Sequence, residues 1–217
     1  MSRFDAVLFD FDGTVADTGK GIFGGVYHTL AHMGLEPPPE EKLRYFIGPP
    51  LHDSFQTVFG FDAETSDAAV KKYREYYREK GMFELTFYDG MEELLVRLRV
   101  SGVKTGIASA KPDIFLKEII ARYQVDEFFD TIAGSDINSI HSDKAEIISA
   151  AIDGLGGLDK SRVLMAGDRK FDIAGAKTAG VKSCGVLYGY GSRAELEEAG
   201  AEYLVKTPGE IFEIVKS

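Results

Sequence analysis

The 217-residue sequence contains no tryptophan, only one cysteine and only seven prolines. The single cysteine, Cys184, excludes an internal disulfide and suits a reducing compartment. There is no run of 18 apolar residues and no signal-peptide pattern near the start of the sequence, so neither a membrane span nor a secretory leader is expected. These absences favour a soluble, cytoplasmic protein.

Basic residues are also scarce, with 25 Lys and Arg against 35 Asp and Glu and a formal net charge of −10. An acidic surface repels phosphate backbones and anionic lipids, so we expect no nucleic-acid polymer and no membrane among the partners. The sequence is 44% hydrophobic, which is ordinary for a globular protein that buries a sizeable core. The length fits one domain, with or without an insertion.

Short apolar runs alternate with helical patterns along most of the sequence. Residues 5–10 form an apolar run that stops at Asp and Gly, which is typical of a strand buried on both faces. Similar runs occupy residues 103–109, 130–134, 162–167 and 181–187. Helical periodicity separates most of them, at residues 90–102, 112–123 and 144–153. This alternation predicts an α/β fold with a Rossmann-like parallel sheet and helices on both faces.

Residues 15–85 interrupt this alternation, because they show helical periodicity and no clear strand. We therefore expect an all-helical insertion at 15–85 and an α/β core formed by residues 1–14 and 86–217. The insertion follows the first strand directly, where a parallel sheet binds its ligands beyond the carboxyl ends of its strands.

Two pairs of aspartates follow predicted strands. Asp10 and Asp12 are one residue apart, so on an extended strand both carboxylates point the same way and repel each other. A hard divalent cation such as Mg²⁺ relieves that repulsion. Gly13 permits a tight turn, in which its amide and that of Thr14 can face an anion. The alternative is a simple strand-ending turn.

The second pair is Asp168 and Asp172, which follow the run at 162–167. Either carboxylate alone can be explained as a cap for the next helix. Capping does not explain why two strands of one sheet both end in paired carboxylates at the same edge. The convergence predicts a metal site there.

Lys144 and Ser109 are candidate anion-binding residues. A lysine in the first turn of a helix opposes the helix dipole by about 0.3–1 kcal/mol, which favours a binding role for Lys144 over an exposed position. The Ser109 hydroxyl and the Ala110 amide can donate to a phosphoryl oxygen. Taken alone, however, Ser109 is more simply explained as a cap of the helix that starts near Pro112.

Together these residues resemble the four motifs of the haloacid dehalogenase-like phosphohydrolases, in the family's order and over almost the whole sequence. The motifs are DxDGT, a Ser that ends the second strand, a Lys that opens a later helix, and GDxxxD. The resemblance implies that 15–85 is a C1 cap, that Asp10 forms an aspartyl-phosphate and that Asp12 is the general acid and base. It also implies phosphate binding by Gly13, Thr14, Ser109, Ala110 and Lys144, and Mg²⁺ binding by Asp10, the Asp12 carbonyl and Asp168, with Asp172 in support.

Residues 43–51 resemble the cap segment of phosphoglycolate phosphatase-like members, and the Pro49-Pro50 pair is more similar to relatives described as 5′-nucleotidases. Arg44 and Lys111 are candidates for contact with a substrate, and the alternative for each is a solvated side chain. We therefore expect a Mg²⁺-dependent phosphatase for a small phosphate monoester, either phosphoglycolate-like or a nucleoside monophosphate, in a monomer or homodimer. The alternatives are a sugar-phosphate mutase of the same fold and a catalytically silent regulator that binds a phosphorylated ligand.

Residues 189–194 match the pattern GxGxxA, which occurs in dinucleotide-binding folds. Too few residues follow this segment to complete a dinucleotide-binding unit, so that function is disfavoured.

Overall fold

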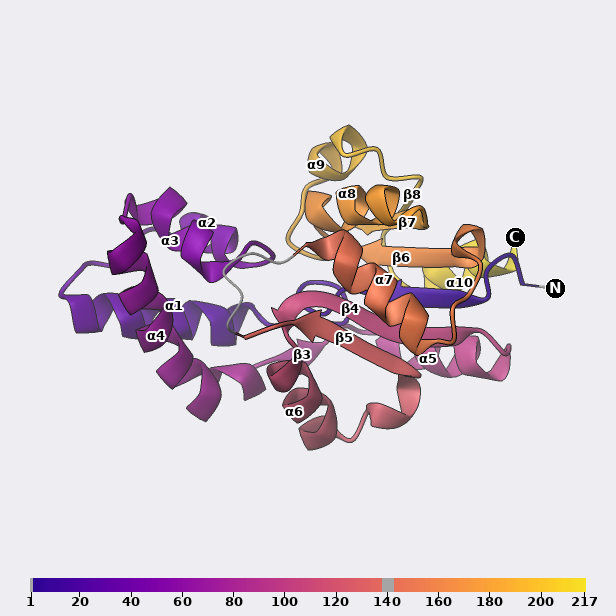
Figure 1. Cartoon of the computed structure of the whole chain (residues 1–217), viewed down its shortest axis with the longest axis horizontal. Helices are drawn as coiled ribbons and strands as arrows, with labels where there is room; N and C mark the ends of the chain where they lie inside the picture. Colours follow the sequence, from indigo (N-terminus) through magenta and orange to yellow (C-terminus); the bar gives the residue numbers. More distant parts are fainter. Residues whose placement is uncertain (1, 138–142) are drawn as a thin grey trace. The chain divides into compact units, whose positions relative to one another are not determined.

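The computed structural model describes residues 2–137 and 143–217. It divides into two compact units, one formed by Met1–Ala16 with Phe87–Ser217 and the other by Asp17–Thr86. Figure 1 shows strands and helices in the first unit and helices in the second. None of the described helices is long and apolar enough to cross a membrane.

The first unit contains a six-stranded parallel sheet with strand order β5-β4-β1-β6-β7-β8. Its strands are β1 (Ala6–Phe9), β4 (Lys104–Pro112), β5 (Thr131–Ser135), β6 (Val163–Gly167), β7 (Lys182–Val186) and β8 (Tyr203–Val205). Strand β1 pairs on both sides and its four residues are fully buried, which explains its unbroken apolar sequence. The predicted parallel α/β core is confirmed.

Helices cover both faces of this sheet (Figure 1). Helices α7 (Lys144–Gly154) and α8 (Lys170–Ala179) pack on one face, and α5 (Met91–Val100), α6 (Asp113–Tyr123) and α10 (Pro208–Lys216) pack on the other. Helix α9 (Arg193–Glu198) and two short 3-10 turns, Asp126–Phe128 and Lys160–Arg162, complete the unit. In α5 the apolar stripe expected from the sequence is buried: Met91, Leu94, Leu95 and Leu98.

The strand register brings three loops to one edge of the sheet. Phe9 at the end of β1 lies opposite Ile107 of β4 and Ala166 of β6. Because the strands are parallel, the residues that follow these three positions lie at the same edge of the sheet. Asp10, Ser109 and Asp168 therefore emerge at the same edge.

The second unit consists of helices and 3-10 turns packed around aromatic side chains. Its elements are α1 (Gly19–Met33), α2 (Glu40–Leu43), η1 (Arg44–Phe46), α3 (Leu51–Phe59), α4 (Ala63–Glu79) and η2 (Gly81–Phe83). Gly25 of α1 lies directly against the ring of Tyr73 of α4, so a side chain at Gly25 would force the two helices apart. The ring of Phe55 packs edge-on against Phe46 and at a tilt against Phe59 in the same unit.

Three features differ from the sequence-based expectation. Residues 15–85, expected to contain only helices, also contain the short strand β2 (Ala16–Asp17), which pairs with β3 (Thr86–Phe87). Strand β4 continues past Ser109 to Pro112, with a register shift against β5. The elements α9, β8 and α10 were not assigned from the sequence. Of these, β8 has only three residues and forms the sheet edge.

Candidate active site

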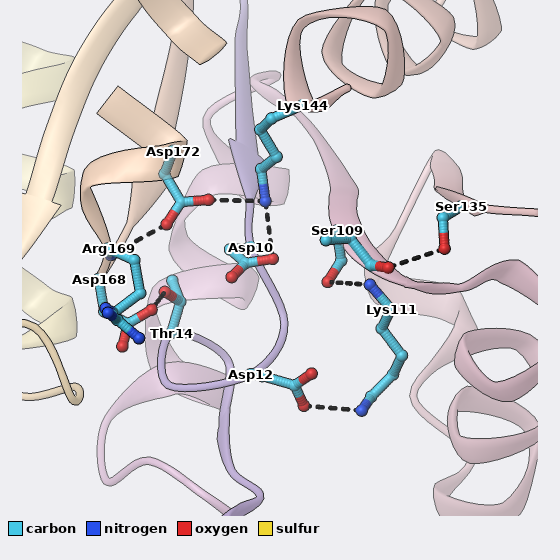
Figure 2. A network of polar contacts seen from close by, with 11 residues as sticks. Asp10, Asp12, Thr14, Ser109, Lys111, Ser135, Lys144, Asp168, Arg169 and Asp172 are labelled. Atoms are coloured by element: carbon cyan, nitrogen blue, oxygen red, sulfur yellow. Dashed lines mark hydrogen bonds and ion pairs between the residues drawn. The ribbon is translucent and has the colours of Figure 1, made fainter. Parts of the chain in front are cut away.

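Lys144 joins two of the predicted carboxylates. It is the first residue of α7, and its Nζ lies 2.8 Å from Asp10 Oδ1 and 2.6 Å from Asp172 Oδ1 (Figure 2). The lysine is buried, so it is not the exposed residue that the alternative interpretation required. Burial by itself would lower the pKa of Lys144, but the charges of Asp10 and Asp172 raise that pKa above its ordinary value. The lysine therefore remains a cation.

Asp10, Asp168 and Asp172 form a compact group of buried carboxylates. Each offers an oxygen, and these oxygens lie within 4.8 Å of one another. Burial, followed by the charges of Asp172 and Asp10, raises the pKa of Asp168 well above its ordinary value. Burial also raises the pKa of Asp172, to about 6, although Lys144 opposes the shift. One ammonium group therefore does not balance the three carboxylates, and their oxygens are the donors that a hard cation prefers.

Asp172 combines this position with helix capping. It lies in the first turn of α8, and its Oδ2 accepts a hydrogen bond from the Arg169 amide at 3.0 Å. The capping interpretation is correct for this carboxylate, but capping uses one oxygen while the other contacts Lys144.

Asp12 lies outside the carboxylate group and pairs with a second buried lysine. Its Oδ1 lies 2.8 Å from the Nζ of Lys111, and the two side chains are 12% and 4% exposed (Figure 2). The Lys111 amide donates to the Ser109 hydroxyl at 3.3 Å. The site thus contains two lysines with separate carboxylate partners. The sequence placed Lys111 near the substrate but gave no sign of its pairing with Asp12.

The expected capping of helix α6 by Ser109 is wrong. Helix α6 begins at Asp113 with Pro112 as its N-cap, so Ser109 does not cap it and its hydroxyl instead accepts from Lys111. The amides of Gly13 and Thr14 donate to the Ala16 and Phe11 carbonyls, because the tight turn that Gly13 permits closes on its own backbone. Their contact with a phosphate stays a prediction.

The remaining predicted residues have the following positions. The Thr14 hydroxyl is 3.5 Å from Asp168 Oδ1, and Ala110 accepts a hydrogen bond from Ser135 through its carbonyl (Figure 2). Arg44 lies in the 3-10 turn η1 of the second unit, where it is exposed, so its contact with a substrate stays a prediction.

A loop that packs on Asp168 was not expected from the sequence. The Tyr190 amide donates to Asp168 Oδ2 at 2.8 Å, and Gly189 and Gly191 lie against Asp168 with no room for a side chain. The paired glycines were the signal available in the sequence, where they matched a dinucleotide-binding pattern. Here the GxG spacing allows the loop at 189–191 to pack closely against the loop that carries Asp168.

The sequence and the fold are similar to those of known proteins. The model of the family described as haloacid dehalogenase-like hydrolase matches residues 7–186. The chain is 39% identical over 194 residues to a 5′-nucleotidase from Pseudomonas aeruginosa, covering 89% of this chain and 87% of the relative. It is 30% identical over 212 residues to the pyrophosphatase PpaX from Bacillus velezensis, covering 98% and 96%.

A third relative has a different activity in its name. The tyrosine-protein kinase PtkA from Mycobacterium tuberculosis is 31% identical over 185 residues, covering 85% of this chain but only 62% of the kinase. Among solved structures, a predicted phosphatase from Clostridium acetobutylicum superposes with a TM-score of 0.91 at 38% identity, covering 97% of each chain.

Proposed function

The chain belongs to the haloacid dehalogenase-like hydrolase family and is a phosphoric monoester hydrolase, and on this basis we propose a Mg²⁺-dependent mechanism through an aspartyl-phosphate on Asp10. The observation that carries the proposal is the contact between Asp10 and the buried, protonated Lys144 inside the carboxylate group. A carboxylate that attacks a phosphoryl group needs neighbouring positive charge, because both reactants are anions.

In the first step an Asp10 oxygen attacks the phosphorus and the bond between phosphorus and the ester oxygen breaks. Asp12, in its protonated form, gives its proton to the departing alcohol. Lys144 faces the developing charge, and Ser109 supports the phosphoryl oxygens beside it. Positioning and charge stabilisation dominate such a transfer, because little of its transition state is covalent to the protein.

In the second step Asp12, now a carboxylate, takes a proton from water as that water attacks the phosphorus of the acyl phosphate. Inorganic phosphate leaves and Asp10 is restored. Lys111 contacts Asp12 at 2.8 Å, so we assign it the task of orienting this side chain between the two steps.

The residues present fit a magnesium ion. Asp10, Asp168 and the Asp12 carbonyl would hold it with support from Asp172, and their donors are the hard oxygen ligands that Mg²⁺ prefers. When bound, Mg²⁺ offsets the negative charge of the phosphoryl group and of the attacking carboxylate.

For the substrate we propose a small phosphate monoester, with nucleoside monophosphates first and phosphoglycolate second. The support is the 39% identity to a 5′-nucleotidase over most of both chains. We propose that the helical unit acts as a cap that admits the substrate and excludes water, and that Arg44 contributes to its specificity.

A phosphate-release screen tests the function. The purified protein is incubated with nucleoside monophosphates, phosphoglycolate, pyrophosphate and sugar phosphates, with Mg²⁺ and with EDTA. We expect Mg²⁺-dependent release from a monoester. No release from any compound would leave the silent regulator, and isomerisation of a sugar phosphate without release would establish the mutase.

Asp10→Asn tests the nucleophile. We expect turnover to fall by more than about a thousandfold, because the amide is not a nucleophile, while the fold remains intact. With ³²P-labelled substrate and acid quenching, the wild-type protein should carry a label that hydroxylamine removes, and the variant should carry none. Asp153→Asn, an exposed change on α7, is the matched control and should keep both activity and label. A labelled, active Asp10→Asn would contradict the assignment.

A further inference from the structure

We propose that residues 188–191, the loop that follows β7, form a positioning element for Asp168 that sets the affinity of the site for its divalent cation. We call these residues the 188–191 loop. The inference rests on the proposed function, because it treats Asp168 as a metal ligand. It assigns a role to the glycine pattern that dinucleotide binding does not explain.

The first contact is a backbone hydrogen bond to the carboxylate itself. The Tyr190 amide donates to Asp168 Oδ2 at 2.8 Å, and Asp168 is fully buried. A main-chain donor has no side-chain torsions of its own, so this bond restricts the carboxylate to one orientation. The Thr14 hydroxyl lies 3.5 Å from the other oxygen, Oδ1.

The second contact is steric and depends on two glycines. A methyl group at Gly189 would collide with the Asp168 side chain and with the Gly13 carbonyl oxygen, and one at Gly191 would collide with the Asp168 carbonyl oxygen. The loop reaches its hydrogen-bonding position only because both side chains are absent. The GxG spacing is therefore a requirement for close packing on Asp168.

The loop also holds the turn that follows the predicted nucleophile. The Tyr188 hydroxyl donates to the Thr14 carbonyl at 3.2 Å, and a β-carbon on Gly13 would collide with the Asp168 carboxylate and with the Tyr190 ring. Gly13 has φ of +80°, a conformation that glycine adopts readily. One loop thus fixes both the 10–14 turn and Asp168, and with them the spacing between the carboxylates.

This arrangement predicts a measurable effect on cation binding. Partners that orient metal ligands through hydrogen bonds typically change metal affinity by about 10–100-fold when they are lost. Gly189→Ala and Gly191→Ala displace the loop from Asp168 without altering any carboxylate or lysine. We expect each to weaken Mg²⁺ binding by about 10–100-fold.

The test is calorimetric titration of Mg²⁺ into substrate-free protein, with folding checked by circular dichroism. Gly209→Ala is the matched control, because a β-carbon at Gly209 meets no atom within 4 Å, and it should bind as the wild-type protein does. If a glycine variant does not fold, Tyr188→Phe decides, since it removes the hydroxyl that holds the Thr14 carbonyl and so loosens the 10–14 turn that carries two of the proposed ligands; it should weaken binding by about tenfold. Unchanged Mg²⁺ affinity in a folded glycine variant, or in Tyr188→Phe, overturns the proposal.

Kinetics distinguish positioning from a general loss of structure. The variants should need more Mg²⁺ for half-maximal activity, while KM for the substrate at saturating Mg²⁺ stays close to the wild-type value. A higher KM with an unchanged Mg²⁺ requirement would refute the inference. Wild-type protein that binds no Mg²⁺ would instead refute the metal dependence in the proposed function, so the two failures are distinct.

Discussion

In the absence of divalent cations, the free energy of unfolding should fall as the pH rises through the weakly acidic range. Asp168 and Asp172 are buried, and burial is the largest cause of the raised pKa of each. In the unfolded chain both carboxyls titrate near their ordinary value of 3.8. Between that value and the folded pKa, the unfolded state has released protons that the folded state still holds. The free energy of unfolding must therefore fall with increasing pH over this interval.

The expected size follows from Asp172, whose pKa rises from 3.8 to about 6. At about 1.4 kcal/mol for each tenfold change in proton affinity, this displacement corresponds to about 3 kcal/mol. The loss runs from about pH 4 to just above pH 6 and continues upward through Asp168, whose pKa is also raised. Domains of this kind are stable by only about 5–15 kcal/mol, so the effect is large enough to measure.

The assay is urea unfolding in EDTA at closely spaced values from about pH 4.5 to about pH 8, repeated with Mg²⁺. Mg²⁺ should flatten the pH dependence, because it binds the ionised carboxylates and so stabilises the folded state most at high pH. A ligand at 100 times its Kd adds about 2.7 kcal/mol to the free energy of unfolding. In EDTA, Asp172→Asn should be less pH-dependent than the wild-type protein, and Asp153→Asn should match it. Wild-type stability that is constant or rises with pH in EDTA would refute the reasoning.

Two further predictions concern buried groups of the core unit. Lys111→Met should lower the free energy of unfolding by about 3–5 kcal/mol, because it leaves the Asp12 carboxylate without its ion-pair partner. The double variant Lys111→Met with Asp12→Asn should lose much less free energy of unfolding than the sum of the two single losses. Strict additivity in urea unfolding would contradict the pairing. Burial raises the pKa of the Cys184 thiol to about 12, so the thiol should react with a disulfide reagent only in denaturant. Rapid labelling of the native protein would contradict the burial of Cys184.

The central fold was predictable because its signals are local. Strands β1 and β6 are buried along their whole length, so each appears in the sequence as an unbroken apolar run. Helix α5 shows its buried face as a period of three to four residues. The edge strand β8 is short and partly exposed, so it leaves neither an apolar run nor an alternation long enough to recognise.

The carboxylate group was predictable for a related reason. Once Asp10 and Asp168 are placed after parallel strands, the topology brings them to one edge without further information. The Lys111 pair with Asp12 and the Tyr190 bond to Asp168 were not predictable in the same way. They depend on the path of a strand beyond its regular pairing and on a loop conformation, and neither produces a periodic pattern.

The charge of the chain can be reconciled with an anionic substrate through these contacts. The net charge of −10 would repel a phosphate ester at a distance. Among the described residues of the site, four carboxylates share two ammonium groups: Lys111 contacts Asp12, Lys144 contacts Asp10 and Asp172, and Asp168 contacts neither lysine, so full ionisation leaves two negative charges. One divalent cation would balance them, which is the role proposed for Mg²⁺. The proposed requirement for Mg²⁺ rests on this imbalance, while burial first, and neighbouring carboxylates after it, raise the pKa of Asp168 and Asp172.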